Sequence, residues 1–440
     1  MRYIFITLLL IVFPKSFSQS ALNSNDCLDY AYEHNFEIQE FCNNINKSRL
    51  DLKQSYLNTL PSVNAEYNHY LSSGRSLNVE TYSWDNEDIQ QGNMALSAEL
   101  VVFKGLYNLY SQQANRIALE KYEFALQQKK LLLGLNIILL FHKVSLNNST
   151  IAILTLTHSG TKEEIKKLEE QITAGTMAKS NIYELQAQAK KEELEILASK
   201  NEKEKNLNNL SKLLNWQEST GLELNTVLPE NYNDTVFHTA LLNNTIVEQS
   251  VITYASEKDL ELAKKAIQLK MSGLYPSLMA NASLSSRYLN DAVNLVSGDN
   301  YTYFNQLDNN QYKQLVITLS IPIFNRHQTA TEIRQLNIEY ENKNLQYENI
   351  KRQLLTELSN IETDILYLKN KITETKAMVE AYKQSYQVAI EKHRSGLLDL
   401  YTLNTSKNNF TASSLQLNRL YVELSMNVEL LKLYLNFTVK

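Results

Sequence analysis

A seven-residue repeat of apolar side chains between residues 333 and 389 constrains this chain more than any other feature. It consists of Ile333, Tyr340, Tyr347, Leu354, Ile361, Leu368, Tyr382 and Ala389, and Thr375 interrupts it. A repeat sustained over this length predicts a coiled-coil helix. The expected helix, about 325–394, would have roughly 70 residues and a length of about 105 Å. Such a helix needs a neighbouring helix to cover its apolar seam.

A strand with one apolar face precedes this helix. Within residues 312–324, the side chains of Leu315, Ile317, Leu319, Ile321 and Ile323 occupy every second position. Alternation of this kind, with β-branched residues, predicts a half-buried β-strand. The segment 277–288 alternates in the same way, so the two strands lead directly into the long helix.

The sequence contains this arrangement twice. Pro61 and Pro276, each at the end of a predicted helix, lie 215 residues apart. Gly175 and Gly396 lie 221 residues apart, as do Asn215 and Asn436. The difference between the two offsets falls between the two strands of each copy, mostly in the hairpin loop. A fixed period of this kind indicates a duplication.

The duplication predicts a mostly α-helical chain with a small β part. Each repeat is a helix, two strands, a long helix, a turn and a returning helix. We expect a signal peptide at 1–20, a first repeat at 21–215, a linker at 216–236 and a second repeat at 237–440. The predicted strands are 62–71, 93–103, 277–288 and 312–324, and the predicted long helices are 104–173, 177–214, 325–394 and 398–436.

Composition supports long elements and export from the cytoplasm. The 440 residues include 10 Gly and 5 Pro, fewer than the usual ~7% and ~5%, which leaves few turns. Arg2, the apolar run at 4–13 and the small residues Ser16, Ser18 and Ser20 match a secretory signal. The net charge of −5 gives no reason to expect a nucleic-acid partner.

The sequence shows no arrangement suited to catalysis or to a cofactor. The seven histidines lack metal-ligand spacing. Neither a phosphate-binding loop nor a nucleophile elbow is present. His158 occupies a seam position, where we expect a packed or lumen-facing imidazole and no metal ligand. Cys27 and Cys42 lie too far apart on one predicted helix to form a disulfide. We therefore expect neither an enzyme nor a cofactor.

The predicted strands have the length of membrane-crossing strands. About ten residues suffice for a tilted strand to cross an outer membrane. Four strands cannot close even the smallest barrels, which have about eight, and no strand edge can stay unpaired in lipid. If these strands cross a membrane, several chains must share one barrel, so the protein would be a homo-oligomer.

Several short motifs stand at matching places in this arrangement. They are Leu60-Pro61-Ser62-Val63, Tyr275-Pro276-Ser277-Leu278, Ser320-Ile321-Pro322-Ile323-Phe324-Asn325 and the glycine turns at 175 and 396. Together with the duplicated elements, they resemble the TolC family of outer-membrane efflux channels over nearly all of the mature chain. The resemblance implies a homotrimer with a twelve-stranded transmembrane β-barrel in the cell outer membrane. Twelve helices would continue this barrel as a coiled-coil α-barrel in the periplasm.

The resemblance also implies a function and partners. Members of the family are passive ducts that export drugs, metals or proteins across the periplasm and outer membrane. They work in tripartite efflux or type I secretion systems, with an inner-membrane transporter and a periplasmic adaptor (membrane fusion) protein. The duct opens by an iris-like movement of its periplasmic helix tips.

By the same resemblance, the two glycine turns are the periplasmic tips and adaptor-docking sites. These residues are Ala174, Gly175, Thr176 and Met177 in the first repeat and Ser395, Gly396, Leu397 and Leu398 in the second. Some relatives carry an aspartate ring six and nine places after the second glycine, where this chain has Thr402 and Thr405. The nearest candidates for gate acids are Glu184 and Asp399.

One alternative function fits part of the pattern. A periplasmic coiled-coil scaffold, or an adaptor that bridges the two membranes, would also have an exported chain with long helices. Adaptors carry one helical hairpin within β-rich domains, whereas this sequence predicts two hairpins and few strands. The outer-membrane duct is therefore the preferred interpretation.

Overall fold

The computed structural model describes residues 21–77, 82–175, 179–216, 222–226, 242–290, 292 and 300–439. The predicted signal peptide and most of the predicted linker lie outside these ranges. The helices are α1 (Ser24–His34), α2 (Phe36–Leu57), α3 (Tyr107–Thr173), α4 (Ser180–Leu214), α5 (Leu242–Gln249), α6 (Val251–Met271), α7 (Tyr303–Asn309), α8 (Gln328–Arg394) and α9 (Leu400–Asn436). The strands are β1 (Ser62–Leu77), β2 (Trp84–Lys104), β3 (Ser277–Leu289) and β4 (Tyr312–Ser320).

The chain folds into two compact units, each built from both halves of the sequence. The strand unit takes the described residues of 43–125 and 252–350, which include all four strands. The helical unit takes those of 1–42, 126–251 and 351–440, which include α4, α9 and most of α3 and α8. Because each unit draws on both repeats, the duplication is a feature of the sequence and not a division into two domains.

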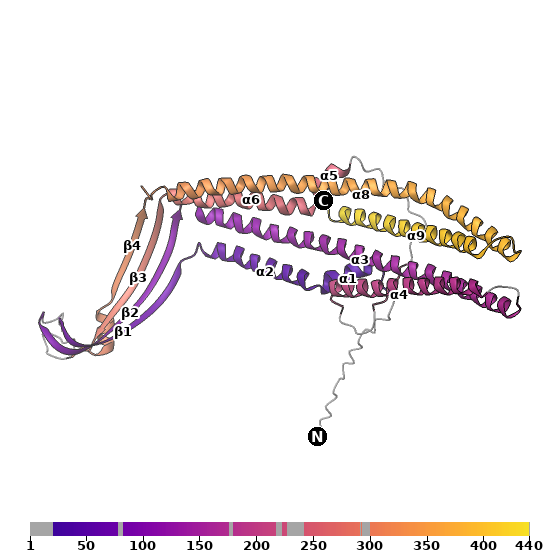
Figure 1. Ribbon diagram of the computed structural model, residues 1–440. Helices are drawn as coiled ribbons and strands as arrows, with labels where there is room; N and C mark the ends of the chain where they lie inside the picture. The colour runs from indigo at the N-terminus through magenta and orange to yellow at the C-terminus, as the bar shows by residue number, and fades with distance from the viewer. Residues whose placement is uncertain are drawn as a thin grey trace, which may run out of the picture. The chain divides into compact units, whose positions relative to one another are not determined.

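The strand unit contains one antiparallel sheet in the order β1-β2-β3-β4 (Figure 1). The two hairpins of the duplicated sequence join through β2 and β3, which pair from Gln91 with Leu289 to Lys104 with Ser277. A bulge between Val101 and Phe103 shifts this register near the end that leads into α3. Within the described residues, β1 and β4 form the two edges of the sheet.

One face of the sheet is apolar and exposed, as the alternation in the sequence predicts. The register places Leu96 opposite both Ala65 and Leu284, so their side chains share this face. We call it the apolar face; it comprises Val63, Ala65, Leu96, Ala98, Leu100, Leu278, Ala280, Ala282, Leu284, Leu315, Ile317 and Leu319. The opposite face is mostly polar and carries residues such as Asn64, Glu99, Asn281 and Thr318.

The first hairpin extends beyond its predicted limits. Residues 72–92 were expected to form a loop, but β1 continues to Leu77 and β2 already begins at Trp84. The polar side chains here favoured a loop. A strand outside a packed core nevertheless tolerates polar residues on both faces when its backbone hydrogen bonds are made.

The second hairpin differs from its prediction in two places. The connection after β3 contains the short helix α7, which Thr302 caps by accepting a hydrogen bond from the backbone N–H of Asn305. Strand β4 ends at Ser320, although alternation extended the prediction to Phe324. Pro322 has no N–H to donate to a strand partner, which explains the earlier end.

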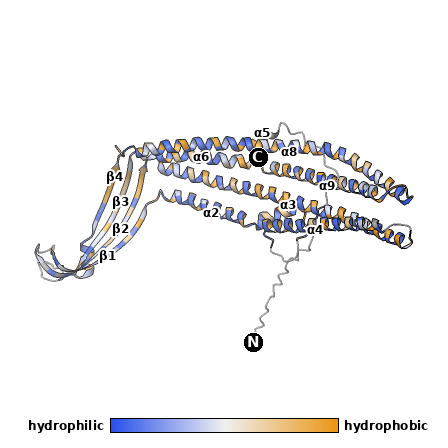
Figure 2. Ribbon diagram, in the orientation of Figure 1, coloured by the Kyte–Doolittle hydropathy of each residue, from blue (hydrophilic) through white to orange (hydrophobic). Residues whose placement is uncertain are grey.

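Long helices pair side by side in each unit. In the strand unit, Lys258 of α6 lies 3.1 Å from Glu120 of α3, and Phe124 of α3 stacks on Tyr254 of α6. In the helical unit, α8 and α9 run alongside each other (Figure 1), and Tyr434 donates a 2.7 Å hydrogen bond to Glu357. Apolar and polar residues alternate along these helices (Figure 2), as coiled-coil packing requires.

The predicted seam of α8 is buried through much of the helical unit. Leu354, Ile361 and Leu368 are buried, and so are Leu358 and Ile365 one turn further along. The row four places after the seam therefore belongs to the same core. Leu133, Leu154 and Leu168 make the equivalent seam of α3.

A break at Asn35 divides the helix that was predicted to end at Pro61 into α1 and α2. The Asn35 side-chain oxygen accepts hydrogen bonds from the N–H groups of Glu37 and Ile38, which caps α2. Its amide nitrogen donates to the carbonyl of Leu213 at the end of α4. This polar side chain thus both starts a helix and fixes it against a neighbour.

Candidate functional site

The second predicted tip is a tight turn between α8 and α9. Gly396 has φ of +72°, which places it in the left-handed region. Its N–H donates to the carbonyl of His393, and the N–H of Leu397 donates to that of Lys392. This pair of bonds is the Schellman motif, which ends a helix on a glycine. The sequence therefore places a sharp helix reversal here, as predicted.

The first predicted tip has the same start. Gly175 has φ of +74°, and its N–H donates to the carbonyl of Ile172. The preceding N–H, of Ala174, donates to Glu170. Thr176 and Met177, the other two predicted tip residues, lie outside the described residues. Neither glycine has another atom within 4 Å of where a Cβ would stand, so backbone conformation alone demands glycine.

Exposed apolar side chains gather around the second tip. Leu397 is 77% exposed and Tyr401, in the first turn of α9, is 71% exposed. Ser395 is also exposed, whereas Leu398 is half-buried and its carbonyl accepts a hydrogen bond from Nδ1 of His393. Large apolar groups without cover on a helix turn are suited to contact with another protein.

The two candidate gate acids occupy different settings. Asp399 caps α9, because its carboxylate accepts hydrogen bonds from both the N–H and the hydroxyl of Thr402. These bonds lower the pKa of Asp399, so it carries its charge over a wider range than an ordinary aspartate. Glu184 is exposed on α4. Both acids thus stand in the first turns after the tips, but Asp399 also has a structural role.

A buried polar network, which the sequence analysis missed, links four helices of the helical unit. At its centre, the ammonium of Lys407 on α9 donates a hydrogen bond to the hydroxyl of Thr161 on α3. Its Nζ lies 3.8 Å from a carboxylate oxygen of Glu164 on α3 and 3.8 Å from one of Glu192 on α4. The side chains of Lys407 and Glu192 are only 4% and 3% exposed.

Neutral and titratable groups complete this network. Glu192 accepts a 2.6 Å hydrogen bond from Thr161 and a 3.0 Å bond from Gln188. His158 places Nδ1 3.5 Å from the same carboxylate. Tyr386 of α8 donates to Glu164, and burial followed by this neighbouring charge raises the pKa of its phenol. The contacts therefore tie the α3–α4 hairpin to the α8–α9 hairpin of one chain.

The sequence contains a signal for this network, although not for its partners. Thr161 interrupts the apolar seam of α3, and Lys407 follows buried Leu403 by four residues on the same face of α9. A lysine at such a position is rarely buried unless a carboxylate meets it. Which carboxylate does so depends on how the helices pair, and the linear pattern does not state that.

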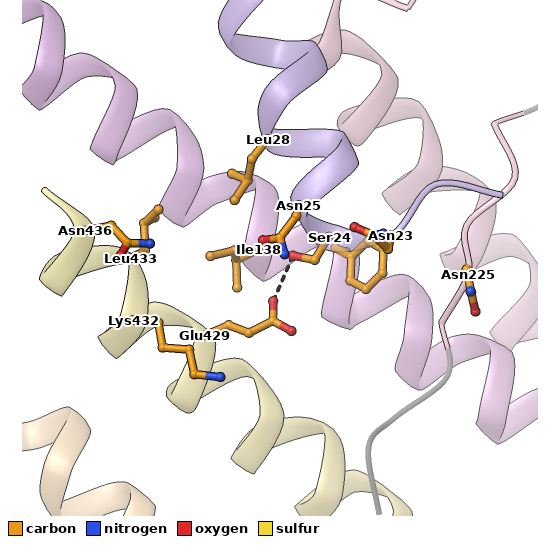
Figure 3. A pocket seen from close by; sticks show the side chains of 11 residues that line it. Asn23, Ser24, Asn25, Leu28, Ile138, Asn225, Glu429, Lys432, Leu433 and Asn436 are labelled. Carbon is orange, nitrogen blue, oxygen red and sulfur yellow. Dashed lines mark hydrogen bonds between the residues drawn. The ribbon is translucent and has the colours of Figure 1, made fainter. Parts of the chain in front are cut away.

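A second polar cluster lies where α1 meets α3 and α9. Ser24 donates a 2.8 Å hydrogen bond to Glu429 (Figure 3). Nε2 of buried His142 lies 3.3 Å from the same carboxylate. Burial raises the pKa of Glu429, but His142, Ser24 and Lys432 together lower it by more than burial raises it, so the net shift is downward. The cluster borders a cavity of about 370 Å³ with an apolar wall that includes Leu28 and Ile138.

Neither cluster has the form of a metal centre. Within the described part of the chain, no group of three or more His, Cys, Asp or Glu side chains could hold a metal ion. One described helix, α3, is long and apolar enough to cross a membrane by composition alone. A core helix of a soluble protein can have the same length and composition. Leu131 and Ile137 are buried, so part of α3 belongs to a packed core.

Comparison with known proteins gives a family for the second repeat and a fold for the whole chain. Residues 254–436 match the family model described as outer membrane efflux protein. No curated protein sequence matches the chain.

Among solved structures, the chain is similar to CusC, with a TM-score of 0.81 and 16% identity over 94% of this chain and 91% of that one. It is similar to VceC, an outer membrane protein of Vibrio cholerae, with a TM-score of 0.79 and 13% identity over 95% and 97% of the two chains. It is also similar to the open MtrE channel of Neisseria gonorrhoeae, with a TM-score of 0.76 and 14% identity over 94% of this chain and 88% of that one. The predicted fold class is therefore confirmed.

Proposed function

We propose that this chain is the passive duct of a tripartite efflux or type I secretion system, and not an enzyme, because residues 254–436 match the outer membrane efflux protein family and the whole chain has the fold of solved outer-membrane channels. Its place in the outer membrane, with a helical extension into the periplasm, follows from the family. The finer proposal concerns its assembly, its gate and its partners.

The observation that carries the proposal is the open sheet. The described strands form one sheet whose edges, β1 and β4, have no further partner among them. In a membrane each unpaired backbone group would cost several kcal/mol, so another chain must pair with both edges. Three copies would supply twelve strands, a number that closes a barrel around an aqueous channel. A homotrimer is therefore the assembly that we propose.

The helix tips are the proposed gate and docking sites. The turns at Gly175 and Gly396 close the hairpins, and exposed Leu397 and Tyr401 offer an apolar surface to a periplasmic adaptor protein. Opening requires the hairpins to move outward, as the leaves of an iris do. Glu184 and Asp399 would then set the charge at the constriction. The cargo, whether drugs, metals or proteins, is chosen mainly by the inner-membrane transporter.

Assembly and conduction can be tested together with the purified full-length protein. We expect native mass spectrometry to give three times the mass of the mature chain. In planar bilayers the same sample should conduct ions without any nucleotide. A monomer that leaves the bilayer non-conducting would contradict the proposal.

Docking at the tip needs a separate test, because a trimer could conduct and still use another surface. Leu397→Asp should abolish export in cells while trimer mass and bilayer conductance stay unchanged. Leu194→Asp is the matched control, since Leu194 is similarly exposed on α4 outside the tip. Normal export by the Leu397 variant would exclude this residue from the docking site.

A further inference from the structure

Helix α7, in the connection between β3 and β4, packs on the apolar face of the sheet. Tyr303 of α7 packs against Tyr288 with ring centroids 4.8 Å apart, and its hydroxyl lies 3.8 Å from the sulfur of Met94. The backbone carbonyl of Leu307 accepts a 2.8 Å hydrogen bond from Ser286. Ser286 pairs with Met94 and Tyr288 with Gly92, which puts all these side chains in phase with Leu284 and Leu96.

The helix is firmly held there. Gln306 of α7 is buried, and its side chain bonds both the N–H and the carbonyl of Leu289 at the end of β3. The side chain of Asn310 donates to the carbonyl of Arg287. In contrast, Phe304 is 79% exposed, and its ring meets the edge of the Tyr303 ring with centroids 5.5 Å apart. Helix α7 therefore covers part of the apolar face and presents a new apolar group of its own.

Beneath α7 is an apolar groove. A cavity of about 440 Å³ lies between the helix and the sheet, bordered by Ala65, Tyr67, Met94, Leu96, Leu284 and Leu307. A second cavity of about 460 Å³ lies beside Leu96 and Leu284 as well, and extends along Val63, Ala98, Ala282 and Leu315. Because both cavities border Leu96 and Leu284, they form one groove along the apolar face.

A lysine stands at the edge of this groove. Lys313 borders the second cavity and pairs with Leu284 in the sheet, so it projects from the apolar face. No ion pair to Lys313 is found among the described residues. A lysine facing lipid destabilises a barrel strand near the membrane centre but not near the interface, where its ammonium reaches the headgroups.

The level of α7 along the strands agrees with such an interface. Ser286 lies nine residues along β3 from Ser277, at the end that connects to the helices, which is roughly 30 Å at about 3.3 Å per residue. A strand tilt of about 40° reduces this to roughly 23 Å, close to the ~25 Å height of the apolar band of an outer-membrane barrel. With Ser277 taken as the periplasmic boundary of the apolar band, the end of β3 near α7 would lie at the outer-leaflet boundary.

We propose that the groove under α7 binds one phosphate-bearing lipid of the outer leaflet, with an acyl chain along Ala65, Leu96 and Ala282 and the phosphate on Lys313. Two observations select this occupant. The groove continues the apolar face, which meets acyl chains in an outer-membrane protein, and the lysine at its edge calls for an anionic headgroup. The inference needs the sheet to be in the membrane but does not depend on the proposed gate or adaptor.

Lipid binding can be measured by native mass spectrometry of the full-length protein in detergent. We expect phosphatidylglycerol to stay bound more than phosphatidylcholine with the same acyl chains. Lys313→Gln should lower the bound fraction of phosphatidylglycerol about fivefold, the effect of one basic residue at an anionic membrane surface, and leave phosphatidylcholine unchanged. Lys264→Gln is the matched control, because Lys264 is exposed on α6 and lies outside the sheet. Two results would overturn the proposal: equal binding of the two lipids by the parent, or equal binding of phosphatidylglycerol by the parent and by the Lys313 variant.

A second measurement tests the position of α7 and does not depend on charge. In a Cys42→Ser background, a spin label on Phe304→Cys should be accessible to oxygen and shielded from a water-soluble nickel chelate. The control is Ser283→Cys, because Ser283 lies on the polar face and should show the reverse. Nickel accessibility at position 304 would place α7 in water, and direct contact with a label on a second copy would make the face a protein interface. Either result would reject the lipid site.

Discussion

Lys407 of α9 and Thr161 of α3 form a buried hydrogen bond between two helical hairpins that the sequence separates by 246 residues. Around this bond, the carboxylates of Glu164 and Glu192 meet the lysine ammonium at 3.8 Å. Charges in such a place are destabilising unless they find partners, because the desolvation of each ion costs several kcal/mol. Any arrangement of the four helices that separated these partners would leave buried charges unpaired, so the network favours the arrangement in which they meet.

Removing the cation should be far more damaging than its share of the apolar core suggests. Lys407→Met keeps the approximate length of the side chain but removes its positive charge, so the buried carboxylate of Glu192 loses its lysine partner. Breaking a buried ion pair in this way costs about 3 to 5 kcal/mol. We expect a clear drop in the midpoint of thermal unfolding, measured by the helical circular dichroism signal of the assembled protein.

Two further variants make this prediction specific. Lys190→Met removes a lysine whose partner Glu193 is exposed, and solvent screens such surface pairs so that they contribute little to stability. The double variant Lys407→Met with Glu192→Gln removes the unpaired charge and should recover part of the loss. If Lys407→Met were no worse than Lys190→Met, the buried network would have no role in stability.

The glycines at turns should differ sharply in their tolerance of alanine. At Gly396 a Cβ would meet no atom within 4 Å, so Gly396→Ala carries only the cost of a left-handed alanine, roughly 1 to 2 kcal/mol. At Gly105, which also has positive φ, a Cβ would stand 2.3 Å from the carbonyl oxygen of Ser272 and 2.9 Å from the Cβ of Tyr275.

Gly105→Ala should therefore displace the backbone between α6 and β3 and prevent assembly, whereas Gly396→Ala should assemble normally. Size-exclusion chromatography of the two detergent-solubilised variants distinguishes these outcomes. Equal yields of assembled protein would mean that the chain near Ser272 moves easily. In that case the close approach at Gly105 would not be essential.

The sequence predicted the elements that depend on periodicity and missed those that depend on contacts. The seven-residue repeat through Leu354 and Leu368 is buried, as expected, and the alternation at Leu315 and Ile317 does lie on one face of β4. Such patterns are local, because each residue needs only its own helix or strand to take its place. The fold class could therefore be predicted before any coordinates.

Contacts between distant segments explain what the sequence analysis did not foresee. The break at Asn35 depends on the carbonyl of Leu213, and the seat of α7 depends on Ser286 and Met94. For the candidate site, the turns at Gly175 and Gly396 followed from the sequence, since a single glycine decides each. The partners of Thr161 did not, because they come from helices α4 and α9.

The two cysteines should react very differently with thiol reagents. Cys27 is fully buried, and burial, followed by the nearby charge of Asp26, raises the pKa of its thiol to about 12. Cys42 is exposed. Only the thiolate is nucleophilic, so maleimide at about pH 8 should label one thiol per chain in the folded protein and two after denaturation. Labelling of a folded Cys42→Ser variant would show that the α1 region opens in solution.

Acid should weaken the cluster around Glu429 in a defined pH range. The folded protein lowers the pKa of Glu429 below its ordinary value of 4.5, so the folded state binds a proton there less readily than the unfolded state. Its stabilising effect is therefore complete above pH 4.5 and disappears as the pH falls through the lower, folded-state pKa. Above this range, ionised Glu429 keeps its contacts with Ser24, His142 and Lys432.

Glu429→Gln removes this titration, and a comparison of the two proteins isolates its effect. At neutral pH we expect the variant to unfold at a lower temperature than the parent, because the glutamine side chain offers no charge to His142 and Lys432. As the pH falls below 4.5, the parent should lose its advantage and the two midpoints should converge. Glu423→Gln is the matched control, since Glu423 contacts exposed Arg419 on the same helix. A midpoint difference that stayed constant from neutral pH down to about pH 3 would mean that Glu429 stabilises the fold through its shape and not through its charge.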